Sequence, residues 1–554
     1  MEKLLIFFLF YFAIIFSIIG YGNIFSLVSN RSYSIGEKGL NGILFLIIIS
    51  YITNFFSTHS FYHNLIVIII GLLAFSFQLI KNFKNKIKEF KIAFIIFSIL
   101  FIGLLMHKNH DDFFYYHFSY TISLIEYKKI LGLGLLNHGF RTPSSIFYLN
   151  SLFYLPHIKY FLINSGAVFI MGFSNLILID KIRYQLKIKK YSFILFLSVL
   201  SFAYINTAFY RIAEHGTDRS ALILIFLLVI TYIESLGILK KKISNINFTI
   251  YYEKIIVLLI LVISLKSFYL IYFVLFFLWL CQFRYFIFHK NIAFTILKNR
   301  YTYIFISGIS LSIFHVFLNT GCLVYPASFT CFDNLLWSIP IDQVEQMKNW
   351  YSLWSKAGAS PNFRVDNPEI YLSNFNWLPR WFSTYFFTKI SDTIFVIFLV
   401  SLICLLILKG KKNDNSNSYD KNFTPLFLIL FFLFLEWFIN HPTLRYGGYT
   451  LFALAFFIPI SIFLEKRLHI HTKLMKQINI LIIIVLSVFI FKNISRLQYE
   501  NDKYQYNLFT NPYFAIEKKN FHFQEIFSKL NFNYREKNNN YYLILDYNII
   551  KSIN

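Results

Sequence analysis

The sequence predicts an all-α, polytopic integral membrane protein, and three observations lead to this fold class. The 554 residues are 57% hydrophobic with a mean hydropathy of +0.56, and only 14% are charged, whereas soluble proteins carry about 25% charged residues. Apolar runs near the membrane-crossing length of ~20 residues recur from end to end. The polar stretches between these runs are too short to hold an independent enzyme domain comfortably.

Windowed hydropathy predicts about 12 to 14 transmembrane helices. The candidate spans lie near residues 4–28, 40–56, 62–80, 89–106, 158–179, 191–210, 220–239, 255–266, 268–288, 302–318, 390–409, 424–440, 446–464 and 478–492. The pair 255–266 and 268–288 is either one long bent helix or a tight hairpin. We therefore expect a multi-span transmembrane domain over residues 1–492 and an extracytoplasmic polar tail over residues 493–554.

The loops between the predicted spans alternate in charge. Lys and Arg concentrate in loops 29–39, 81–91, 180–190, 240–254, 284–301, 409–421 and 465–476. The positive-inside rule assigns these loops to the cytoplasm, so the outer face carries loops 107–157, 211–219, 319–389 and 441–445. Every unusual polar cluster of the sequence falls in these outer segments. The sequence therefore predicts one active, extracytoplasmic face.

The net charge of +25 does not indicate a nucleic-acid-binding protein. The positive residues fall mainly in short loops between spans, and the sequence has no basic stripe with interleaved aromatic residues on a soluble domain. The expected partner of most of the chain is the lipid bilayer, and no nucleic acid is expected.

Two adjacent acids, Asp111 and Asp112, lie in the stretch 107–117, which directly follows the apolar run 92–106. Acids at the mouth of a membrane helix are costly to place. Because neighbouring carboxylates repel, one can keep a raised pKa and act as a base near neutrality, or the pair can hold a divalent cation that binds phosphate. The simpler alternative is a solvated helix end. The crowding of His110 and His117 into the same stretch favours a function.

Two further segments of the outer face carry charge next to apolar runs. Glu214, His215 and Asp218 share a turn of about nine residues, where they can form a second acidic element facing the first, or where Asp218 caps the following helix. Lys266 interrupts an apolar stretch and therefore needs an anionic partner, either a phosphate or a loop carboxylate, unless it reaches the surface.

The turn 441–448 contains His441, Arg445 and a pair of glycines. Arginine offers a rigid fork for a phosphate or a carboxylate, and glycines allow a ligand to approach the backbone closely; the alternative is an interfacial anchor. A second arginine, Arg141, follows segment 119–136, whose spacing predicts an amphipathic helix on the membrane surface. Arg141 is either a head-group ligand or an ordinary surface arginine.

The loop 319–389 contains two cysteines and five tryptophans. Cys322 and Cys331 both lie outside in this topology, where an oxidising compartment allows a disulfide. The tryptophans are either membrane-interface residues or platforms for sugar rings. The chain has no cysteine and histidine spacing typical of zinc, no glycine-rich nucleotide loop and no recognisable Ser/His/Asp motif.

Three of these pieces look like those of a family of uncharacterised bacterial polytopic membrane proteins. They are His110-Asp-Asp-Phe-Phe-Tyr-Tyr-His117, His215-Gly-Thr-Asp218 and His441-Pro-Thr-Leu-Arg-Tyr-Gly-Gly448, and the likeness extends to about residue 490. Acids after an early span, an amphipathic helix, many spans and an active outer face also resemble the GT-C superfamily of membrane glycosyltransferases. The resemblance implies a bacterial inner-membrane transferase that uses a polyprenyl-phosphate-linked sugar.

We therefore expect sugar transfer to a surface glycan or lipid acceptor on the outer face. The resemblance maps the role of base, or of metal or acceptor ligand, onto Asp111 or Asp112. Arg445, Lys266 and Arg141 are expected to bind phosphate, from their charge alone, and no cofactor beyond a divalent cation is expected. The remaining candidate substrate ligands are His110, His117, Glu214, His215, Asp218 and His441.

Two alternatives to this function stay open. An O-antigen-type polymerase or ligase shares the donor, the face and the arginine chemistry. A transporter or flippase for a lipid-linked glycan belongs to another class, and it would favour charges at the bilayer midplane and an internal repeat. We find no convincing repeat, and the charges cluster at one surface.

Overall fold

The computed structural model describes most of the chain. The described residues are 1–554 apart from residues 30, 189–191, 215, 240–244, 284–291, 361–362, 409, 411–423, 468–470, 517–540, 545–546 and 551–554. Helices dominate these residues, and the only strands assigned in the described part form two antiparallel hairpins, β1 (Ala359–Ser360) with β2 (Phe363–Arg364) and β3 (Tyr541–Ile544) with β4 (Tyr547–Ile550).

The first half of the chain forms most of the packed helical core. Its helices are α1 (Glu2–Ser29), α2 (Ile35–Phe56), α3 (Phe61–Leu104), α4 (Phe118–Glu126), α5 (Ser145–Ser151), α6 (Gly166–Lys187), α7 (Phe193–Ala208), α8 (Gly216–Leu239) and α9 (Asn245–Leu265). Shorter helical turns are η1 (Phe113–His117), η2 (Leu133–Leu135), η3 (His138–Phe140) and η4 (Ser267–Tyr272).

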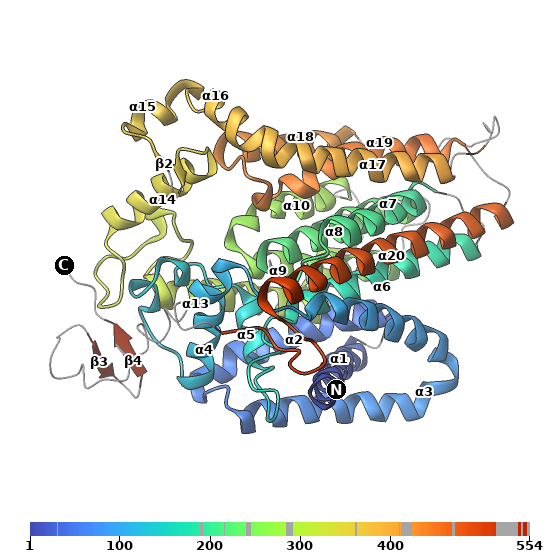
Figure 1. The fold of residues 1–554 in the computed structure, drawn as a ribbon, viewed down its shortest axis with the longest axis horizontal. Coiled ribbons are helices and arrows are strands. Elements are labelled where there is room, and N and C mark those ends of the chain that lie inside the picture. The colour runs from blue at the N-terminus through green and yellow to red at the C-terminus, as the bar shows by residue number, and fades with distance from the viewer. Residues whose placement is uncertain are drawn as a thin grey trace.

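The second half adds helices around this core. They are α10 (Phe273–Gln282), α12 (Ile292–Lys298), α13 (Arg300–Thr320), α14 (Ile341–Ser355), α15 (Pro368–Leu372), α16 (Leu378–Trp381), α17 (Ser391–Leu408), α18 (Thr424–Asn440), α19 (Gly448–Glu465) and α20 (His471–Tyr504). The short turns here are η5 (Ser328–Thr330), η6 (Ser373–Phe375), η7 (Phe382–Ile390) and η8 (Leu444–Tyr446). Figure 1 shows α6, α7, α8, α17 and α20 running across the view, with α4, α5 and α14 toward the left.

The chain is a multi-pass membrane protein. Within the described residues, nine helices are long and apolar enough to cross a bilayer, and three shorter apolar helices accompany them. The nine are Glu2–Leu27, Ile35–Phe56, Phe61–Ile80, Gly216–Gly237, Asn247–Leu265, Arg300–Thr320, Leu378–Leu408, Gly448–Glu465 and Lys473–Tyr504. The all-α membrane class predicted from composition is therefore what the structure has.

Three of the predicted boundaries differ from the structure. The spans predicted at 62–80 and 89–106 belong to one helix, α3, whose ribbon curves at the right of Figure 1. The span predicted at 158–179 begins later, at Gly166, because residues 158–165 form turns. The predicted boundary at residue 492 falls inside α20, which continues to Tyr504.

The amphipathic surface helix predicted over residues 119–136 is wrong. The short helix α4 and the turn η2 form there instead of one long helix, and the α4 residues from Phe118 to Ile125 are buried within the protein. Lys129, a charged residue between them, is only 2% exposed. The apolar spacing correctly indicated a helix at the start of this segment, but its apolar residues pack against protein rather than against lipid.

Small residues let the first helices approach each other closely. A Cβ atom on Gly20 of α1 would lie 1.8 Å from the carbonyl oxygen of Gly71 in α3, and one on Gly42 of α2 would lie 1.9 Å from the carbonyl oxygen of Ile18. Contacts of this kind are typical of membrane helices, where small residues bring backbones together.

The bundle has polar networks near both of its ends. At the predicted cytoplasmic end, Lys254 binds Glu37 at 2.7 Å, and Lys181 pairs with Glu234. These pairs join α2, α6, α8 and α9. The polar clusters singled out in the sequence are therefore not the only ones in the structure. Segments predicted as basic loops contribute helix residues, Lys181 of α6 and Lys254 of α9, that pair with acids on neighbouring helices.

Candidate functional site

The centre of the candidate site is an ion-paired trio made of Asp218, Lys266 and Arg445. The Asp218 carboxylate accepts from Lys266 Nζ at 2.6 Å through Oδ1 and from Arg445 Nε at 2.8 Å through Oδ2. Asp218 stands in the first turn of α8, Lys266 follows α9, and Arg445 lies in η8 between α18 and α19. Three helix ends therefore deliver one carboxylate and two cations to one place.

Aromatic side chains surround the two cations of this trio. Lys266 Nζ lies 4.5 Å from the ring centre of Tyr446, and the guanidinium carbon of Arg445 lies 5.4 Å from that of Trp354. The hydroxyl of Tyr269 donates to the backbone carbonyl of Arg445 at 2.7 Å and holds the turn in place. Such rings strengthen cation binding and limit water access.

Asp112 joins the trio from the loop after α3, and Asp111 does not. Arg445 Nη1 lies 3.9 Å from Asp112 Oδ2, whereas among the described residues Asp111 forms an ion pair only with Lys108, at 3.8 Å. The Asp111 side chain is 91% exposed and that of Asp112 is 36% exposed. The adjacent acids thus face different surroundings, and only Asp112 borders the cations.

Three histidines of the candidate set, His110, His117 and His441, lie around the trio. His110 Nδ1 accepts from the backbone N–H of Asp112 at 3.2 Å. Burial lowers the pKa of His117 to about 4 and that of His441 to about 4. Both imidazoles are therefore neutral near pH 7, and they suit hydrogen bonding better than charge pairing with a phosphate. His215 lies outside the described residues.

Arg141 is occupied within the outer loops. Its Nε donates to the carbonyl of Gly134 at 3.1 Å, and its Nη1 donates to the Tyr325 hydroxyl at 3.1 Å. Arg141 therefore fastens the loop after α4 to the loop after α13, and in the structure it is a loop clamp. Of the three cations predicted to bind phosphate, Lys266 and Arg445 therefore meet at Asp218, whereas Arg141 contacts the loops.

A buried lysine near this clamp was not among the sequence candidates. Lys129 Nζ donates to Asn319 Oδ1 at 2.7 Å and to the Tyr148 hydroxyl at 3.3 Å. Within the described residues no acid pairs with it in a salt bridge, and burial lowers its pKa to about 7. A lysine in an unfolded chain has a pKa of about 10.4.

Lys129 gives the folded protein a pH dependence of known sign. Between pH 7 and pH 10 the unfolded chain keeps a proton that the folded chain releases, so the free energy of unfolding rises with pH. We expect wild type to gain stability relative to Lys129→Met between pH 7 and pH 9. Thermal unfolding of both purified proteins at several pH values measures this difference, and parallel curves would contradict the burial argument.

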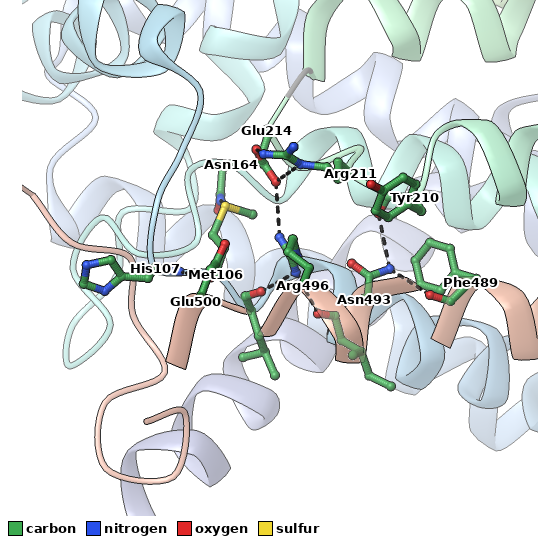
Figure 2. A network of polar contacts seen from close by, with 12 residues as sticks. Met106, His107, Asn164, Tyr210, Arg211, Glu214, Phe489, Asn493, Arg496 and Glu500 are labelled. Carbon is green, nitrogen blue, oxygen red and sulfur yellow. Dashed lines mark hydrogen bonds and ion pairs between the residues drawn. The ribbon is translucent and has the colours of Figure 1, made fainter. Parts of the chain in front are cut away.

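Glu214 belongs to a second network, on the other side of the turn from Asp218. Its side chain is fully buried and pairs with Arg211 and with Arg496, the latter through Nη1 at 3.2 Å. Arg496 Nη2 also donates to the carbonyl of Leu105 at 2.5 Å, just beyond the end of α3. Figure 2 shows Arg496 on α20 reaching toward Glu214, with Arg211 beside it.

The C-terminal end of α20 also positions the loop that carries the two acids. Glu500 Oε2 accepts from the backbone N–H of His107 at 2.7 Å, and Ala515, beyond α20, donates its N–H to the His107 carbonyl at 2.8 Å. The ring of Phe514 packs 5.5 Å from that of Phe113. The sequence did not indicate these roles, since residues after 492 were expected to form a polar tail.

The large outer loop 319–389 packs over this face. Cys322 is disulfide-bonded to Cys331, the pair that the sequence suggested. Trp377 and Trp381 are buried, and Trp381 Nε1 donates to the carbonyl of Pro442 at 2.8 Å. Of the predicted aromatic residues, these two therefore support the turn before Arg445, whereas Trp354 contacts the arginine itself.

The donor set does not assemble a cage for a divalent cation. Among the described residues there is no group of three or more His, Cys, Asp and Glu side chains placed to hold a metal ion. Asp111 and Asp112 diverge, and Asp218 already binds two cationic side chains, whereas Ca²⁺ and Mg²⁺ need several oxygen ligands around one point. We therefore derive no step through a metal.

Comparison with known proteins gives a family without an assigned activity. The family model described as "Domain of unknown function (DUF8201)" matches residues 4–452. No curated protein and no solved structure matches the chain. Since the matched region covers most of the sequence and includes Asp112, Asp218, Lys266 and Arg445, the chain belongs to this family.

Proposed function

We propose that this member of the DUF8201 family is a membrane glycosyltransferase that moves a sugar from a polyprenyl-phosphate donor to a glycan or lipid acceptor on the predicted outer face. The observation that carries the proposal is the meeting of Asp112 with the Asp218–Lys266–Arg445 trio. A carboxylate beside two cations is the arrangement needed by a reaction that removes a proton and releases a phosphate.

Asp218 is a positioning residue in this proposal. It is 7% exposed and binds both cations, so it fixes their direction. The side chain of Arg445 is 31% exposed and that of Asp112 is 36% exposed, so both can be reached from water. Arginine and lysine together suit a phosphate group because one offers a flat fork and the other a point charge.

The proposed reaction exchanges one bond for another at the anomeric carbon of the donor sugar. The acceptor oxygen attacks this carbon as Asp112 takes the hydroxyl proton, and a new C–O bond forms. The bond from the carbon to the phosphate oxygen breaks, and its electron pair stays on the polyprenyl phosphate. Lys266 and Arg445 stabilise the charge that develops there.

The test compares surface glycans and lipid-linked intermediates in a deletion strain that carries each variant. We expect wild type and the control Asp366→Asn, an exposed acid of the same face, to restore the glycan. Asp112→Asn at normal abundance should lower transfer by about 10²–10⁴-fold and leave the glycan one sugar short. If Asp112→Asn restores it fully while a lipid-linked precursor accumulates only in the deletion, transport becomes the better account.

A further inference from the structure

A cavity of about 240 Å³ lies beside Asp111. It is formed by the loop after α3, by Arg211 in the turn before α8 and by Tyr499 at the outer end of α20. A water molecule occupies about 30 Å³, and small-molecule sites begin near ~300 Å³. The cavity is therefore larger than a hydration site and approaches the size of a small ligand site.

The deepest polar wall of the cavity is a buried arginine with an unused donor. The Arg496 side chain is 8% exposed, and it lines the cavity. Its Nη1 binds Glu214 and its Nη2 binds the carbonyl of Leu105, but its Nε is buried without an acceptor among the described residues. A buried unpaired donor costs about 1–3 kcal/mol, and the arginine that carries it forms part of the cavity wall.

The charges in and beneath the cavity balance. They are the cations Lys108, Arg211 and Arg496 and the carboxylates of Asp111, Glu214 and Glu500. A phosphate in the cavity would meet two lining carboxylates, and the buried Glu214 already pairs with two of the three lining cations. A neutral ligand that both donates and accepts hydrogen bonds satisfies the two kinds of group together, and sugar hydroxyls do both.

Two tyrosine rings add an apolar component to the same cavity. Tyr499 and Tyr504 both line it. The Tyr499 side chain is exposed, whereas Tyr504 stacks against His107 with ring centres 5.0 Å apart. Paired acids and arginines beside the exposed ring of Tyr499 match the two sides of a sugar ring, which has polar edges and an apolar C–H face.

We infer that this cavity binds a neutral sugar unit of the acceptor glycan. Binding of the sugar follows from the cavity alone, whereas its role as acceptor rests on the proposed function. The two adjacent acids then belong to two different sites, the sugar cavity and the ion-paired trio. Asp111 faces the cavity and Asp112 faces Arg445, so a sugar bound at Asp111 lies on the acceptor side of the proposed base.

The binding test uses full-length protein in nanodiscs and saturation-transfer NMR. The probes are the methyl glycosides of glucose, galactose, mannose, N-acetylglucosamine and N-acetylgalactosamine, with glucuronate and inorganic phosphate as charged comparisons. We expect at least one neutral glycoside to bind and to bind more strongly than either anion. Tyr499→Ala should weaken it by about tenfold, a loss of about 1.4 kcal/mol, and Tyr62→Ala, an exposed tyrosine outside the cavity, should not.

Two outcomes overturn the sugar site. One is that none of the neutral glycosides binds wild type, and the other is that binding is the same in Tyr499→Ala as in wild type. Asp112→Asn separates this inference from the proposed function, because it should bind the sugar normally. If it does so and also restores the glycan in cells, the cavity remains a sugar site and the transferase proposal fails.

Discussion

Glu214→Gln is expected to lower the free energy of unfolding by about 3–5 kcal/mol, the cost of breaking a buried ion pair on one side. The Glu214 carboxylate is fully buried, and it accepts from Arg211 Nε at 2.7 Å and from Arg496 Nη1 at 3.2 Å. A glutamine keeps the shape but turns an NH₂ group toward one guanidinium. Arg496, which also holds the end of α3, would then be a buried charge without its counterion.

Unfolding of the purified protein in detergent measures this loss, with Glu345→Gln on α14 as the matched control. Glu345 is exposed, so its substitution should change stability by no more than about 0.5 kcal/mol. The Glu214 variant should also release the loop after α3, which limited proteolysis would detect. Unfolding of both variants at the wild-type midpoint would show that the Arg211–Glu214–Arg496 network stabilises nothing.

The membrane class and most helices could be predicted from sequence because hydropathy is a local property. The loop predicted between spans 62–80 and 89–106 is instead part of one helix, α3, and the reason also lies in the local sequence. The intervening segment is rich in lysine, which the positive-inside rule treats as a loop, but lysine is also a good helix former. Charge alone could not tell a cytoplasmic loop from the polar middle of α3.

The site was only partly predictable. The sequence shows that a charged residue in an apolar stretch needs a counterion, but it does not show which residue supplies that counterion. An apolar stretch containing Lys266 implied an anion nearby, and Asp218 fills that role at 2.6 Å. The same reasoning could not separate Asp218 from Glu214. The turn before α8 sends Glu214 toward α20, whereas Asp218, in the first turn of the helix, faces η8.

Arg496 and Glu500 were missed because hydropathy falls near residue 492 and the helix does not end there. Their spacing of four residues places them on one face of α20, which is the signal that could have indicated a longer helix. Their targets, Glu214 and His107, lie 282 and 393 residues away. Such pairings depend on how the helices pack against each other, so they cannot be predicted from a single sequence.

Asp218→Asn is expected to convert the trio into a stronger phosphate site in a less stable protein. In wild type the carboxylate neutralises both cations, at 2.6 Å from Lys266 and 2.8 Å from Arg445. The amide leaves the two positive charges facing each other, and an anion that binds them stabilises the folded state by mass action. Farnesyl phosphate should therefore raise the unfolding temperature of Asp218→Asn more than that of wild type.

Farnesol is the control for this measurement, since it has the same chain without the phosphate and should stabilise the two proteins equally. Arg445→Met removes the guanidinium that lies between Asp218 and Asp112, so its response to farnesyl phosphate should fall below that of wild type. Equal responses from wild type, Asp218→Asn and Arg445→Met would mean that the phosphate binds elsewhere. The trio would then be a structural ion-pair cluster, and the proposed leaving-group chemistry would lose its basis, because among the described residues Arg445 is the only Lys or Arg that pairs with Asp112.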